Sequence, residues 1–444
     1  MRIQLSDHFS YGKLLRFTLP SIAMMIFTSI YGVVDGFFVS NFAGDIPFKA
    51  VNLIMPFLMI VATVGFMFGT GGTAIVSYTM GQGERKRANR YFSLFVYVTF
   101  SLGLLFAVLA IVFLRPIAQL LGAEGEILEN CVLYGRIVLC ALPFEVLQFL
   151  FQSFFVAAEK PKLGLGVIIA AGVTNMVLDA VLVMLLPQEY KLAGAALATA
   201  FSQFVGGVVP LIYFFRKNSS LLRLGKTKFE GKIILRACAN GSSEFMSNVS
   251  MSIVGMLYNM ELLKHAGDDG IAAYGVMMYV SMIFSAAFIG YSIGTAPVIG
   301  YHNGAGNHPE LRGILKKSIT LLGACGALML GSAELLAGPL AKLFVSYSAP
   351  LTEMTVHGFR IFAVSFPFMG FAIFASGFFT ALNDGLTSAL ISFLRTLVFQ
   401  AGAVVLLPML WGIDGIWYSV VVAEAAAALL SFLFLMFKRK KFHY

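Results

Sequence analysis

Charge is the scarcest property of this sequence. Only 12% of its 444 residues are Asp, Glu, Lys or Arg, whereas typical soluble domains carry about 25%. Hydrophobic residues make up 59% of the chain, and the mean hydropathy is +0.85. So few charged residues cannot cover the surface of a soluble domain. The composition therefore excludes the soluble enzymes and the soluble nucleic-acid-binding proteins. The composition indicates an integral membrane protein.

Cysteine and histidine are also rare. The four cysteines lie singly among apolar stretches without metal-like spacing, and the six histidines form no ligand cluster. No HExxH, P-loop or GxSxG stretch is present. We therefore expect packing roles for the cysteines, no cofactor, and no metal site beyond a possible Na⁺ site.

Apolar runs long enough to cross a bilayer recur along the whole chain. A hydrocarbon core about 30 Å thick requires about 20 apolar residues per helix. Because the predicted number of helices is even, both termini are expected on one side of the membrane. The twelve helices are expected near 17–40, 51–79, 92–114, 131–157, 164–186, 192–215, 238–263, 272–302, 316–337, 354–381, 387–409 and 415–437.

The distribution of lysine and arginine predicts the side of the membrane on which the termini lie. The loops on the side of the termini hold 23 of these residues, seven of them in the linker 216–236, and the alternate loops hold five. The positive-inside rule therefore predicts cytoplasmic termini in a cell inner (plasma) membrane protein. The net charge of +9 then reflects orientation, with no nucleic-acid partner, and no obligate protein partner is evident.

The two halves of the chain repeat each other. Six predicted helices fall in each half, so both copies have the same orientation, as in transporters built from parallel repeats. The segment pairs, with shifts of 224, 223 and 221 residues, are 136–158 with 360–382, 71–83 with 294–306, and 185–187 with 406–408. The sequence therefore predicts an all-α membrane protein of two pseudo-symmetric six-helix bundles. Its parts are an N-lobe (1–215), a basic cytoplasmic linker (216–236) and a C-lobe with a basic tail (237–444).

A few acidic residues interrupt the apolar helices. A charge at a helix centre costs about 2.5–3.5 kcal/mol and usually serves ion or substrate handling. Asp179 lies in "TNMVLDAVLVMLL", and Asn175 is four residues earlier on the same helical face. Thr199 is on the next helix, and Asp35 is on the first helix of the same bundle. These oxygens suit Na⁺, and equally a proton shared by two carboxylates; interhelical hydrogen bonding alone is the alternative.

The second half differs at the matching positions. With a shift of 221 residues, Thr396 and Gln400 replace Asn175 and Asp179. The acidic pair is therefore expected in the N-lobe alone, which predicts asymmetric ion coupling.

Other membrane residues are predicted to act on substrate or on gating. Glu244, near the cytoplasmic end of the seventh helix, is a candidate for cationic substrate or for a gate, with a solvated or Arg-paired role as the alternative. Pro20 removes a backbone hydrogen bond from the first helix and allows that helix to bend. Because few lysines enter the membrane, the cavity should favour lipophilic or cationic small molecules. We expect an arginine to neutralise the charge of Glu145 and that of Glu424. The available partners are Arg136, Arg360 and Arg395.

Several of these features resemble the multidrug and toxic compound extrusion (MATE) family. They are the loops "MGQGERKRANR" and "NGAGNHPELRG", the helix "TNMVLDAVL" and the aspartate of the first helix. The resemblance implies a V-shaped antiporter that exports organic cations or xenobiotics in exchange for H⁺ or Na⁺ by alternating access. It also implies an N-lobe cation site at Asp35, Asn175, Asp179 and Thr199. Some members couple instead through acids on helices 7 and 10, but the segment 354–381 has no internal acid.

Two other classes of function stay open at this point. A flippase for a lipid-linked saccharide would favour several cationic residues in the cavity, and few are seen. An intramembrane enzyme would need a catalytic motif, and none stands out, so we expect a protein that is not an enzyme.

Overall fold

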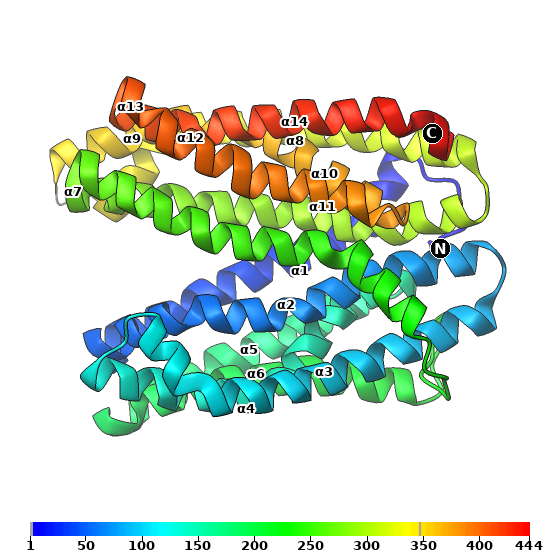
Figure 1. Cartoon of the computed structure of the whole chain (residues 1–444), viewed down its shortest axis with the longest axis horizontal. Coiled ribbons are helices and arrows are strands. Elements are labelled where there is room, and N and C mark those ends of the chain that lie inside the picture. The colour runs from blue at the N-terminus through cyan, green and yellow to red at the C-terminus, as the bar shows by residue number, and fades with distance from the viewer. Residues whose placement is uncertain (1–2, 346–347) are drawn as a thin grey trace.

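Two helical bundles lie side by side in the computed structural model, which describes residues 3–345 and 348–444 (Figure 1). No strand occurs in these ranges. The first bundle contains α1 (Tyr11–Phe38), a π-helical segment η1 (Val39–Ala43), α2 (Asp45–Gly81), α3 (Arg85–Leu120), α4 (Gly125–Ala157), α5 (Pro161–Leu185), the short 3₁₀ turn η2 (Gln188–Tyr190) and α6 (Lys191–Phe215). The second contains α7 (Gly231–Gly304), α8 (His308–Val345), α9 (Ala349–Ala363), α10 (Phe366–Ala381), α11 (Gly385–Phe393), a π-helical segment η3 (Leu394–Phe399), α12 (Gln400–Leu406), α13 (Pro408–Trp411) and α14 (Ile413–Phe442).

The described helices account for twelve membrane crossings. Ten helices are long and apolar enough to span, and the bent pair α9 and α10 makes an eleventh crossing. The 74 residues of α7 would extend about 110 Å as one straight helix, more than three times the hydrocarbon thickness. Gly267 interrupts α7 with φ 61° and ψ −151°, a conformation that glycine adopts readily. The segments 231–266 and 268–304 are therefore separate spans, and the all-helical fold is confirmed.

Three predicted parts of the helical pattern differ from the structure in detail. The expected loop between 263 and 272 is replaced by the single non-helical residue Gly267. The expected helix 354–381 is two helices bent by 46°, because Pro367 near the start of α10 cannot continue the preceding helix. The expected span 387–409 is confirmed as Gly385–Trp411, but it contains the π-helical segment η3, and a new helical turn begins at Pro408.

The lobes meet along a seam of glycines between α2 and α7. A Cβ on Gly81 would collide with the backbone of Tyr301, and a Cβ on Gly304 would collide with the backbone of Tyr78. These residues are matched by the 223-residue shift, so each glycine packs against the tyrosine of the other copy. The repeated residues are explained by this pseudo-symmetric crossing, which requires helix backbones in direct contact. Gly241 makes a similar contact with Met67.

Adding one methyl group to the seam should destabilise the protein. We expect Gly304→Ala to lower the unfolding free energy by about 1–3 kcal/mol, because α2 and α7 must move apart. Gly323→Ala is the matched control, since a Cβ at this position in α8 meets nothing within 4 Å. The control should be neutral or stabilising, because alanine favours a helix. Thermal unfolding of both purified variants tests this, and equal midpoints would contradict the close crossing.

The N-terminal segment joins the same ends of the two lobes. The backbone N–H of Leu5 donates to Glu159 Oε1 at the end of α4, 2.8 Å away. The N–H of Phe9 donates to Glu310 Oε1 in α8, 2.9 Å away, and Lys317 donates to the Phe9 carbonyl. Leu5 and Phe9 are fully buried. The segment therefore adds contacts that hold the lobes together on the side of the chain termini.

The C-terminal tail is tied to the second lobe on this side as well. Asp384, in the turn between α10 and α11, forms ion pairs with Lys438 at 3.2 Å and Lys441 at 3.7 Å. Burial opposes ionisation of Asp384, but the hydrogen bond and charge of Lys438, with Thr387 and Lys441, outweigh it and hold the pKa of Asp384 below its ordinary value. The carboxylate is therefore charged at neutral pH and anchors the basic tail.

Candidate functional site

The first lobe brings four predicted residues together inside the bundle. Asp35 comes from α1, Asn175 and Asp179 from α5, and Thr199 from α6. The helix α5 packs against both α1 and α6. The side chain of Asp35 interacts with those of Asp179, Asn175 and Thr199. Asp35 is 7% exposed, Asn175 2% and Asp179 0%, so the protein has withdrawn both carboxyl groups from solvent.

Several oxygens of this cluster face one another without a donor. One carboxyl oxygen of Asp35, both of Asp179 and the amide oxygen of Asn175 are buried and have no hydrogen-bond partner among the described residues. The Thr199 hydroxyl group donates a hydrogen bond to the Ala195 carbonyl at 3.2 Å. The lone pairs of the Thr199 oxygen are therefore free to face the cluster. Burial of unpaired carboxylates is strongly unfavourable. A proton or a hard cation bound between these oxygens would relieve that penalty.

A cavity of about 140 Å³ adjoins this cluster. Besides Asp35, Asn175 and Thr199, it is lined by polar and aromatic side chains that include Tyr31, Tyr134, Glu145, Gln148 and Gln203.

Glu145 has a different environment from the one predicted. The described residues place no cationic partner on it, and its side chain interacts with Gln203 of α6. Arg136 is nine residues earlier in α4, about two and a half turns away, and so lies on the opposite face. Arg360 pairs with Glu334. The expectation of a neutralising arginine for Glu145 is therefore wrong.

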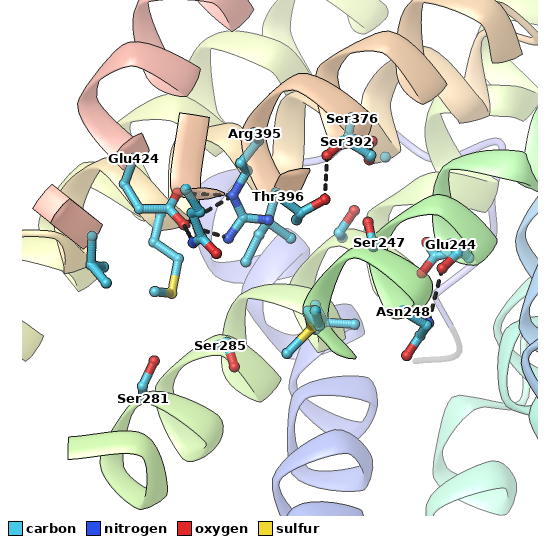
Figure 2. A pocket seen from close by; sticks show the side chains of 18 of the residues that line it. Glu244, Ser247, Asn248, Ser281, Ser285, Ser376, Ser392, Arg395, Thr396 and Glu424 are labelled. Carbon is cyan, nitrogen blue, oxygen red and sulfur yellow. Dashed lines mark hydrogen bonds and ion pairs between the residues drawn. The ribbon is translucent and has the colours of Figure 1, made fainter. Parts of the chain in front are cut away.

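A second cavity, of about 240 Å³, lies mainly in the second lobe. Figure 2 shows Arg395 and Glu424 on one side of it and Glu244 of α7 on another. Glu424 is fully buried and accepts from Arg395 Nε at 2.8 Å and from Nη2 at 2.9 Å. Gln400 also donates to Glu424, at 3.3 Å. The predicted pairing of Glu424 with an arginine is confirmed.

Glu244 lies in the wall of the second cavity, and Pro20 lies beside the contact between α1 and α7. Glu244 lines the second cavity and forms no ion pair with any lysine or arginine of the described ranges. Pro20 lies within α1, which is helical on both sides of it, and its neighbours Ser21 and Ile22 contact Gly290 of α7. Thr396 and Gln400, the counterparts of Asn175 and Asp179, line the second cavity.

Two pseudo-symmetric lobes of membrane-spanning helices, each with a polar cavity, define a multi-pass membrane transporter. The chain belongs to the MatE family, whose profile matches residues 20–181 and again residues 244–405. The second match begins 224 residues after the first, the same spacing as the longest repeated segment. As a member of a family of transporters, the chain is a transporter and not an enzyme.

Relatives and solved structures agree with this assignment over almost the whole chain. The multidrug export protein MepA of Staphylococcus haemolyticus is 26% identical over 423 residues, which cover 95% of this chain and 92% of MepA. MepA of Staphylococcus aureus is 24% identical over 435 residues, with 97% and 94% covered. The outward-facing structure of a multidrug resistance MATE family transporter has a TM-score of 0.92 at 21% identity and covers 98% of this chain and 97% of its own.

Proposed function

We propose that this transporter exports lipophilic or cationic small molecules in exchange for H⁺ or Na⁺. The observation that carries the proposal is the pair of buried carboxyl groups, Asp35 and Asp179, whose oxygens lack partners in the first lobe. Such a pair binds a proton or Na⁺ and changes charge when it does so. The multidrug export proteins among the relatives supply the substrate class.

The two lobes provide the conformational change. The glycine seam and the N-terminal segment close the protein on the side of its termini, which we place in the cytoplasm of a plasma membrane protein because of the basic loops. Opening to that side requires the α2–α7 crossing to separate. Because α1 contacts α5 of its own lobe and α7 of the other, a bend at Pro20 would connect the charge of Asp35 with the seam.

Efflux of ethidium under imposed gradients tests the proposal. Proteoliposomes containing the purified protein are loaded with ethidium and given either a pH gradient or a Na⁺ gradient. We expect one gradient, and not a matched solution without it, to drive ethidium across the membrane. Absence of gradient-driven efflux under both conditions would refute exchange of this substrate class for either ion.

A flippase for lipid-linked saccharides is the alternative that fits the fold. Holding a pyrophosphate group calls for several free cationic side chains in the cavity. Among the described residues that line the two cavities, the one cationic side chain is Arg395, and Glu424 already binds it. One paired guanidinium group does not supply the several cationic side chains that a pyrophosphate group requires, which favours export over lipid flipping.

A further inference from the structure

We infer that the second-lobe cavity binds amphoteric molecules, with Glu244 receiving an ammonium group and Arg395 receiving a carboxylate. The cavity is large enough for part of a drug-sized ligand, at about 240 Å³. It presents an acid and a guanidinium group from different elements, α7 and η3. This inference specifies the substrate class of the proposed export function and rests on that function.

Arg395 keeps a donor available for a ligand. Its Nε and Nη2 donate hydrogen bonds to Glu424. Its Nη1 forms no hydrogen bond with any residue that the structure describes. The guanidinium side chain is 15% exposed, whereas Glu424 is fully enclosed. Since Glu424 fixes the orientation of the guanidinium group and Arg395 lines the cavity, a ligand there can use the remaining donor at little entropic cost. The π-helical turn η3 places Arg395 there, as such turns often do at functional sites.

Glu244 supplies the opposite charge. It lines the cavity in the same wall as Ser247 and Asn248 (Figure 2), and no ion pair with a lysine or arginine satisfies it in the described ranges. Because Glu424 is paired with Arg395, Glu244 is the acid left for a ligand among the described residues that line the cavity. An ammonium group of the ligand would neutralise it through charge-assisted hydrogen bonds.

The remaining walls suit an aromatic scaffold that carries polar groups. Tyr258 and Tyr274 stack with their ring centroids 4.8 Å apart and their planes at 9°, and both line the cavity. Such rings attract flat and cationic groups. The cavity is also lined by residues that carry hydroxyl groups and by flexible methionines: Thr70, Ser247, Ser281, Ser285, Met251 and Met278.

A pair of dyes that differ in one charge tests the inference. Rhodamine 110 is a zwitterion at neutral pH with N–H donors on its cationic xanthene, and its methyl ester, rhodamine 123, is a monocation with the same donors. Fluorescence anisotropy with the purified wild type should show the zwitterion binding about tenfold more tightly than the ester. Glu244→Gln should weaken the binding of both dyes by about tenfold, whereas Glu334→Gln, which alters an ion pair outside the cavity, should weaken neither.

The double variant Arg395→Gln/Glu424→Gln isolates the carboxylate contact. Since it removes both charges, it should fold, and its preference for the zwitterion should fall to about onefold. If the double variant fails to fold, Arg395→Lys takes its place. It keeps the charge that pairs with Glu424, but it should reduce the preference for the zwitterion, because an ammonium group lacks the fork of donors.

Equal binding of the two dyes by the wild type, no binding of either, or an unchanged preference in the Arg395 variants would overturn the inference. Binding requires no ion gradient, so these failures are distinguishable from a failure of export.

Discussion

Asp179→Asn should abolish gradient-driven export without reducing the stability of the protein. Asparagine has the shape of aspartate but cannot change its charge, so the first-lobe cluster would no longer take up and release the driving ion. We expect ethidium efflux in proteoliposomes to fall to the background of protein-free vesicles. Asp35→Asn should have the same effect, because its carboxyl group shares the cluster.

The stability of the same variants separates ion binding from a structural role. Both carboxyl oxygens of Asp179 are buried without a hydrogen-bond partner among the described residues, so removal of the charge relieves an unfavourable burial. The thermal unfolding midpoint should therefore stay unchanged or rise. Asp45→Asn, at the exposed start of α2, is the control and should keep full efflux. An Asp179→Asn protein that exports normally, or one that loses both efflux and stability, would contradict the assignment.

Arg395→Ala should produce the largest loss of stability of any substitution considered. It leaves Glu424 fully buried without the guanidinium group that binds it, and breaking a buried ion pair from one side costs about 3–5 kcal/mol. We expect a lower unfolding midpoint in detergent and less folded protein in the membrane.

The double variant Arg395→Gln/Glu424→Gln is the matched comparison for this effect. Because it leaves no unpaired charge, most of the lost stability should return. Arg360→Ala, which removes an exposed partner of Glu334 at 3.6 Å, should change stability by less than about 1 kcal/mol. Equal losses in the Arg395 single and double variants would show that the ion pair is not the source of the effect.

The membrane-spanning segments could be predicted because they depend on local composition and on repetition. Apolar length determines which segments cross the bilayer, and the repeated residues of the 223-residue shift, Gly81 with Tyr78 and their counterparts, proved to be the lobe contacts themselves. The first-lobe cluster could also be predicted. Asn175 and Asp179 share a helical face, and buried carboxyl groups stand out in apolar helices.

Other features depend on tertiary structure and left a weaker trace. The sequence predicts a break between 263 and 272, but it does not indicate that one non-helical residue, Gly267, makes that break. Nothing in the local apolar pattern distinguishes the π-helical turn η3 from continuous helix. The sequence predicts an arginine partner for Glu424, but only the tertiary structure selects Arg395, 29 residues away, from the three available arginines. The arginine expected beside Glu145 is absent because Arg136, nine residues earlier in α4, lies on the opposite helical face.

The most direct test of ion exchange is to measure the movement of the ion while a gradient of the substrate drives transport. Proteoliposomes with an imposed ethidium gradient, and no initial pH or Na⁺ gradient, are monitored with a pH-sensitive dye and with radioactive Na⁺. The proposal predicts that ethidium movement drives H⁺ or Na⁺ in the opposite direction in the wild type and drives neither ion in Asp179→Asn. Ion movement of equal size in both proteins, or ethidium movement without any ion movement in the wild type, would contradict it.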